Sequence, residues 1–240
     1  MKKNPCRVTG KRLDWCIGMK TPILGHGIYT LPEAARLVHT SAARLKAWFC
    51  GWPRRPGPIT RSDYQEPVGS SRVISFLDLI DALVVAELRG QKVPLQYLRK
   101  VRDALAEELG SPHPFCYKNL YTQGRHVFIE IAAEGADRHL KELVANQYAF
   151  MRILSPFLKT VQYAEQTLTA MQWRPYRGVV LDPQRQFGKP IVESVNIPTS
   201  ILAAAYKANK KDTAAVAEWY AVAPRDITTA VKFEEKWLAA

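Results

Sequence analysis

Small and basic side chains share one face of a short segment near the start of the chain, a pattern that suits contact with nucleic acid. The segment runs from Ser41 to Phe49, and its outward face is expected to carry Ser41, Ala43, Arg44, Lys46 and Ala47. Alanine lets a helix approach the bases closely, while arginine and lysine reach guanine edges or phosphate oxygens. The segment is therefore predicted to bind DNA in the manner of a recognition helix.

The residues that could carry catalysis do not converge in this sequence. It contains no GxSxG, Walker or HExxH motif. The histidines, His26, His39, His113, His126 and His139, are scattered over turns and expected hairpin edges, where we expect surface or capping roles. The four cysteines lack the CxxC spacing of a zinc site and are expected to be reduced thiols. We predict a protein that is not an enzyme, with no cofactor and no metal site.

Positive charge is concentrated in the first third of the chain. The first 75 of the 240 residues account for +9 of the formal net charge of +12. Such a balance predicts attraction to a polyanion. Residues 1–27 are expected to form a flexible basic arm that either touches phosphates or is simply solvated. The sequence shows no membrane span or signal peptide, so we expect a cytoplasmic protein.

Helices must hold the DNA-facing segment in place, and their end signals can be recognised. Thr30 and Glu33 form a capping-box pattern that starts a short first helix, and Ser41 starts the second. After a loop rich in proline and arginine, an extended run at 72–76 leads to a helix that Ser75 caps and that ends at Gly90. A further helix is expected from Pro94 to Gly110.

This order resembles the MerR-type winged helix-turn-helix. The resemblance spans about residues 28–110 and is carried by residues 29–35, 41–48, 74–79 and 90–99. It implies DNA contact by the helix at 41–49, with Arg44 and Lys46 as donors. It also implies contact along the wing by Arg54, Arg55, Arg61 and Arg72, although a solvated basic loop is the alternative for these four. We assign residues 28–133 to this domain.

Residues 134–182 are expected to form a helical connector. Before it, residues 120–131 alternate as a β-hairpin would. Residues 137–171 show helical spacing that Pro156 must divide, and residues 173–183 are predicted to form an extended linker. The connector holds four candidates for a dimer surface, with core packing as the alternative: Leu140, Tyr148, Met151 and Leu158.

The last fifty residues are predicted to form three short helices around a small core of their own. The segment resembles the bacterial domain of unknown function 433 over about residues 183–238, through residues 187–192, 197–199, 217–220 and 224–234. We assign residues 183–240 to this helix-turn-helix-like domain. The predicted fold class of the whole chain is therefore mainly α, with a small β wing.

The combination of these parts resembles the long antitoxins of the VapB family. That resemblance implies inhibition of a cognate PIN-like ribonuclease toxin, and repression of the operon by a homodimer that reads an inverted repeat. Because such nucleases hold Mg²⁺ with carboxylates, we hypothesise that Arg174, Arg177 or Arg185 of the linker enters the acidic site. The main alternative is a stand-alone MerR-like transcriptional regulator whose C-terminal domain dimerises or binds a ligand. In a third interpretation, the C-terminal lysines and arginines, Arg225 among them, form an additional DNA-binding head.

Overall fold

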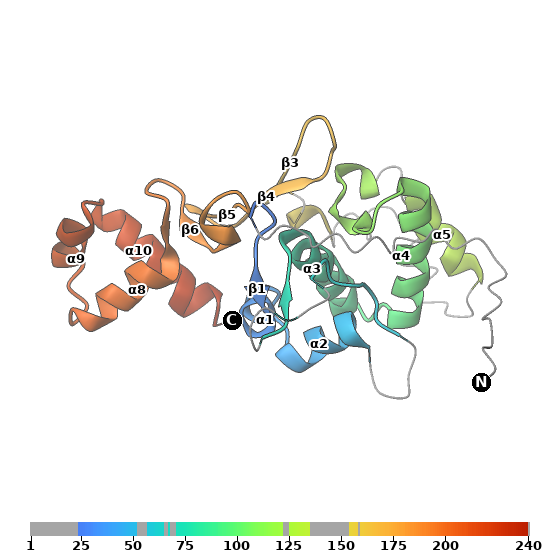
Figure 1. The fold of residues 1–240 in the computed structure, drawn as a ribbon, viewed down its shortest axis with the longest axis horizontal. Helices are drawn as coiled ribbons and strands as arrows, with labels where there is room; N and C mark the ends of the chain where they lie inside the picture. Colours follow the sequence, from blue (N-terminus) through green and yellow to red (C-terminus); the bar gives the residue numbers. More distant parts are fainter. Residues whose placement is uncertain are drawn as a thin grey trace, which may run out of the picture.

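The fold is mainly α-helical, with two small antiparallel sheets. The computed structural model describes residues 24–51, 57–64, 67, 71–121, 125–134, 154–157 and 159–239. In Figure 1, helices α8 to α10 lie at one end of the molecule, α4 and α5 lie at the other, and the larger sheet lies between them. Among the described helices, none combines the length and the apolar character needed to cross a membrane.

The N-terminal part is a cluster of four helices around a two-stranded sheet. Its elements are β1 (Tyr29–Thr30), α1 (Leu31–Leu37), α2 (Ala42–Cys50), β2 (Val73–Ile74), α3 (Phe76–Gly90) and α4 (Leu95–Leu109). The two strands pair antiparallel, with Tyr29 opposite Ile74. The four helices lie where the sequence predicts them, with ends that agree to within a few residues.

Local capping signals account for this agreement. The Thr30 side chain accepts from the Glu33 backbone N–H while the Glu33 carboxylate accepts from the Thr30 N–H, which completes the predicted capping box. Ser75 begins α3 in the same way, with Asp78 as its reciprocal partner. Gly110 ends α4 with a φ of 60°, the left-handed conformation that glycine adopts without strain.

The predicted hairpin at 120–131 is wrong. Two short 3₁₀ turns, η1 (Pro114–Cys116) and η2 (Lys118–Tyr121), are followed by helix α5 (Arg125–Glu134). Val127 and Phe128 are buried, and α5 packs on α4, where the Tyr97 hydroxyl donates to the Phe128 carbonyl oxygen. This tertiary contact outweighs the β propensity of the apolar run.

The predicted helical connector and extended linker are also corrected, because the described part of this region contains more strand than helix. Helical backbone appears at residues 154–157. Five antiparallel strands then follow in the order β3-β4-β5-β6-β7: β3 (Val161–Tyr163), β4 (Ala170–Tyr176), β5 (Val179–Leu181), β6 (Ile191–Val192) and β7 (Ile197–Pro198). The three residues of β5 are fully buried at its centre, so burial and pairing determine its conformation. The four candidates for a dimer surface lie outside the described residues.

The C-terminal end contains the three predicted helices, α8 (Thr199–Ala208), α9 (Thr213–Tyr220) and α10 (Pro224–Lys232), and a final π-helical turn at Phe233–Trp237. A small core joins Val192 of β6 to Leu202, Val216 and Ile227. Helix α8 ends at Asn209, which has a φ of −93°, and the two residues after it, Lys210 and Lys211, take positive φ values.

The start of the N-terminal helical part packs against the C-terminal half of the described chain. The Ile28 N–H donates to the Phe187 carbonyl oxygen at 2.9 Å, and the rings of His39 and Trp237 meet edge to face at 4.5 Å. The last residues of the predicted mobile arm take part, since the Gly25 carbonyl oxygen accepts from the Gln184 side chain. Residues 24–27 are therefore fixed, and the rest of the arm lies outside the described residues.

Candidate nucleic-acid interface

Helix α2 presents a small, basic face to solvent. The Ser41 hydroxyl caps the helix by accepting from the Arg44 N–H at 3.2 Å. Ser41, Ala43, Arg44 and Lys46 are exposed, whereas Leu45 and Trp48 are buried against the core. The other exposed residues at the start of the helix, Ser41, Ala42 and Ala43, are small, so the backbone of α2 can approach a flat or grooved partner closely.

One residue of the predicted face is placed differently. Ala47 is only 7% exposed, whereas Ala42, which is not part of the predicted face, is exposed. The chain after α2 folds back over its last turn, where the Ile59 and Thr60 N–H groups both donate to the Trp48 carbonyl oxygen. This return segment covers part of the last turn, where Ala47, Trp48 and Phe49 are buried although Cys50 is exposed.

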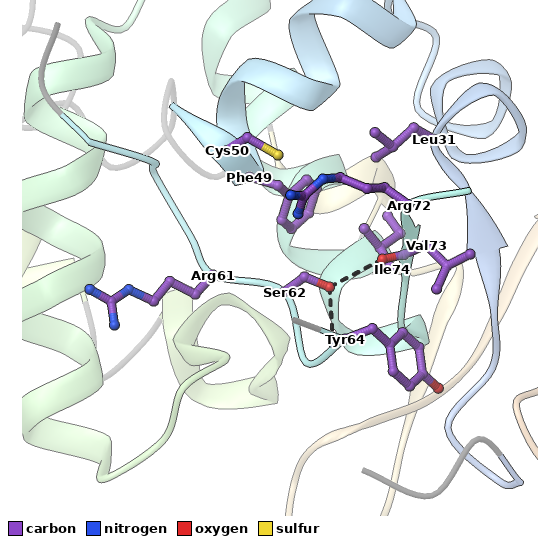
Figure 2. A pocket seen from close by; sticks show the side chains of 9 residues that line it. All are labelled: Leu31, Phe49, Cys50, Arg61, Ser62, Tyr64, Arg72, Val73 and Ile74. Carbon is purple, nitrogen blue, oxygen red and sulfur yellow. Dashed lines mark hydrogen bonds between the residues drawn. The ribbon is translucent and has the colours of Figure 1, made fainter. Parts of the chain in front are cut away.

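A surface pocket lies between the end of α2 and the segment that follows it (Figure 2). It is lined by Leu31, Phe49, Cys50, Arg61, Ser62, Tyr64, Arg72, Val73 and Ile74. Arg72 extends across Phe49 toward Cys50, while Arg61 points away from the group (Figure 2). Both arginines are exposed. Two of the four predicted wing arginines are thus placed beside α2, and Arg54 and Arg55 lie outside the described residues.

Buried Asp78 holds the segment with these arginines against α3. One carboxylate oxygen, Oδ2, accepts from three donors: the Ser62 hydroxyl at 2.8 Å, the Asp63 N–H at 3.1 Å and the Ser75 N–H at 2.9 Å. Asp78 is fully buried. The helix cap of α3 and the position of Arg61 therefore depend on the same side chain.

His113 joins this network from the far end of α4. Its Nδ1 lies 3.0 Å from Asp81 Oδ2, and its Nε2 lies 2.9 Å from Asp63 Oδ1. The Cys116 thiol, fully buried, donates to the Leu77 carbonyl oxygen at 3.2 Å and contacts Asp81 Oδ1 at 3.4 Å. The predicted surface role of His113 is wrong, since the residue is 3% exposed; it stands at the N-cap position of η1, but its side chain makes no capping hydrogen bond there.

Burial controls the acid–base behaviour of these groups. It raises the pKa of Asp78 to about 7, although the nearby His113 opposes the change. Burial by itself lowers the pKa of His113, but hydrogen bonds and attraction to Asp63 and Asp81 raise it to about 11. Burial also raises the pKa of the Cys116 thiol. At neutral pH, His113 is therefore an imidazolium and Cys116 a thiol.

Known proteins are similar to this chain over most of its length. No family model matches the chain, so that comparison supports neither the MerR resemblance nor the one to domain 433. The protein named "Putative antitoxin VapB45", from Mycobacterium tuberculosis, is 30% identical over 222 residues, which cover 85% of this chain and 92% of the relative. The chain belongs to the VapB family of antitoxins. The crystal structure of Rv2018 from Mycobacterium tuberculosis matches with a TM-score of 0.68 at 27% identity, over 85% of this chain and 96% of Rv2018.

In this VapB-family chain, the three arginines that the sequence singled out lie in or beside the larger sheet and differ in their surroundings. Arg174 donates to Gln162 and to Glu193, both at 2.7 Å, and Arg185 forms an ion pair with Asp182 at 2.8 Å. Arg177 stands at the turn between β4 and β5, is exposed, and forms no ion pair with another described residue. Arg177 is the one of the three whose guanidinium is available to a partner.

Proposed function

We propose that this chain is a VapB-type antitoxin that binds operator DNA through α2 and inhibits a cognate PIN-like ribonuclease toxin. The observation that carries the DNA half is the exposed face of α2, with Arg44 and Lys46 on its first turns and Arg72 beside its end. Family membership supports the toxin half. Both halves are consistent with a regulator that performs no chemistry itself.

For DNA binding, the first turn of α2 enters the major groove and Arg44 reads a base edge. Arginine forms two parallel hydrogen bonds to guanine, the commonest specific contact in protein–DNA complexes. Arg61 and Arg72 contact phosphates, which adds affinity without reading sequence. A homodimer that places two α2 helices in successive turns of the groove would recognise an inverted repeat.

For toxin inhibition, the turn between β4 and β5 presents Arg177 to the carboxylates of the toxin. A PIN-like active site gathers acidic side chains around Mg²⁺, and a guanidinium can pair with two carboxylate oxygens at once. Arg174 and Arg185 instead brace the sheet on which this turn is built, because their guanidinium groups are occupied within the chain.

A paired experiment tests the two halves. The full chain is co-expressed with the product of the adjacent gene, and the complex is isolated and titrated against promoter DNA. We expect a stable complex in which the toxin no longer cleaves its RNA substrate. We also expect the chain to bind promoter DNA about 10³-fold or more tightly than unrelated DNA. Promoter binding without a toxin partner would instead indicate the stand-alone regulator, and equal binding to all DNA would contradict operator recognition.

A further inference from the structure

Two pairs of potential metal ligands meet in the core beneath the 57–64 segment. Asp78 and Asp81 lie three residues apart on the first turns of α3, so their side chains share one face. His113 and Cys116 lie three residues apart at the two ends of turn η1, which packs on α3. The four residues are 3% exposed or less. Two short-spaced pairs from separate elements are typical of structural metal sites.

Three of these residues, Asp81, His113 and Cys116, lie close enough together to share one ion. His113 Nδ1 lies 3.0 Å from Asp81 Oδ2 and 3.9 Å from Asp78 Oδ1, and Cys116 Sγ lies 3.4 Å from Asp81 Oδ1. The ligand atoms of Asp81, His113 and Cys116 all lie within 4.8 Å of one another. Bonds of 2.0–2.3 Å in a tetrahedral zinc site put neighbouring ligand atoms roughly 3.3–3.6 Å apart.

Hydrogen bonds within the cluster leave one buried oxygen atom without a partner in the part of the chain that the structure describes. An imidazolium between Asp63 and Asp81 satisfies both ring nitrogens of His113, and Asp78 Oδ2 has three donors. Asp78 Oδ1, however, is buried and has no hydrogen-bond partner among the described residues, although it faces His113 Nδ1. A buried oxygen without a donor is costly, and a positive ion beside it removes that cost.

We propose that Asp81, His113 and Cys116 bind a zinc-class divalent cation, with the unpaired Asp78 Oδ1 on the side of His113 Nδ1. Nitrogen, sulfur and carboxylate ligands together favour a metal of borderline softness over Mg²⁺ or Ca²⁺. Binding takes one proton from His113 Nδ1 and one from the Cys116 thiol, and both protons pass to solvent. The remaining ring proton on Nε2 then donates to Asp63 Oδ1, 2.9 Å away, as an outer carboxylate does in many zinc sites.

Such an ion would join three parts of the chain that are distant in sequence. Asp63 comes from the segment that carries Arg61, Asp78 and Asp81 from α3, and the last pair from the chain after α4. The sequence-based prediction of no metal site rested on the absence of CxxC spacing among the cysteines. The proposed site differs from that prediction, because it combines one cysteine with a histidine and a carboxylate. It does not depend on the proposed DNA or toxin binding, and its test uses neither partner.

The test measures metal binding by the purified full chain after treatment with a chelator and a reductant. Zn²⁺ is titrated by calorimetry, and Co²⁺ is added as a spectroscopic probe. We expect one Zn²⁺ per chain, and a cobalt spectrum with tetrahedral visible bands and a sulfur-to-cobalt charge-transfer band. Asp63→Asn should weaken Zn²⁺ binding by about 10- to 100-fold while the cobalt bands remain. A folded chain that takes up neither ion would overturn the proposal.

Two complementary variants test whether Cys116 supplies the sulfur ligand. Cys116→Ser should abolish the charge-transfer band. Because that variant alters a buried side chain, the complementary variant replaces Cys6, Cys16 and Cys50 with serine and leaves Cys116 as the one thiol. Retention of the band in this triple variant supports the site, and its loss overturns the site even where Cys116→Ser does not fold.

Discussion

The Tyr29 hydroxyl donates a hydrogen bond of 2.7 Å to the carbonyl oxygen of Gly188, which lies 159 residues further along the chain. Tyr29 is 2% exposed at the start of β1, and Gly188 is buried at the end of the 3₁₀ turn Gln186–Gly188. Burial raises the pKa of Tyr29, and the Asp182 carboxylate raises it further, so the hydroxyl keeps its proton. This contact fixes the first strand beside the larger sheet.

Replacement of Gly188 by alanine should disrupt this junction. The residue has a φ of +80°, which strains any side chain, and an added Cβ would clash with the Tyr29 hydroxyl. We expect Gly188→Ala to lower the free energy of unfolding by about 2–4 kcal/mol, from backbone strain and the lost buried hydrogen bond. Urea denaturation of the full chain measures the change.

Gly90→Ala is the matched control. Gly90 ends α3 without a positive φ, and a Cβ there meets no atom within 4 Å. The free energy of unfolding should change by no more than about 1 kcal/mol, in the stabilising direction if at all. Equal stability of the two variants would show that β1 is not joined to the larger sheet through Gly188.

The parts of the fold that the sequence predicts well are those that local signals determine. Thr30, Ser41 and Ser75 each begin a helix through a hydrogen bond to a residue three positions later, so a few adjacent residues suffice to locate the start. The exposure of Arg44 and Lys46 follows from helical spacing in the same way.

The parts predicted wrongly are those that distant contacts determine. Val127 and Phe128 belong to a helix because α4 covers them, and residues 179–181 belong to a central strand because β4 and β6 flank them. Likewise, the approach of His113 to Asp63 spans 50 residues of chain. No window of sequence contains both partners of such a contact, so spacing cannot reveal it.

Arg44→Ala should weaken binding to the promoter and relax its sequence preference. Loss of a paired contact to guanine costs about 1–3 kcal/mol at the base that it reads. Titration of promoter DNA and of variants mutated at single base pairs measures both effects. Arg225→Ala on α10 is the control, because it removes the same exposed charge from the C-terminal helices. A larger loss from Arg225→Ala would place the DNA contact on the C-terminal unit.

Arg72→Ala should lower the affinity for DNA without changing the sequence preference. A phosphate contact contributes equally on every sequence, so the variant should bind promoter and unrelated DNA more weakly by the same factor. The slope of log affinity against log salt concentration should also become shallower by about 1, since one fewer counterion is released. An unchanged salt slope would mean that Arg72, although exposed beside α2, does not reach the DNA backbone.

Arg177→Ala should reduce toxin neutralisation more than Arg174→Ala does. Arg177 is exposed at the turn between β4 and β5, whereas the Arg174 guanidinium is occupied by Gln162 and Glu193. Truncation of a charge that pairs with buried carboxylates of a partner costs about 2–5 kcal/mol, much of it from leaving those carboxylates unpaired. The affinity of the purified complex and the ribonuclease activity at fixed antitoxin concentration measure the loss. Equal effects of the two variants would indicate that the sheet as a whole, rather than the Arg177 side chain, forms the contact. Unchanged neutralisation by both variants would contradict the proposal that an arginine pairs with the toxin carboxylates.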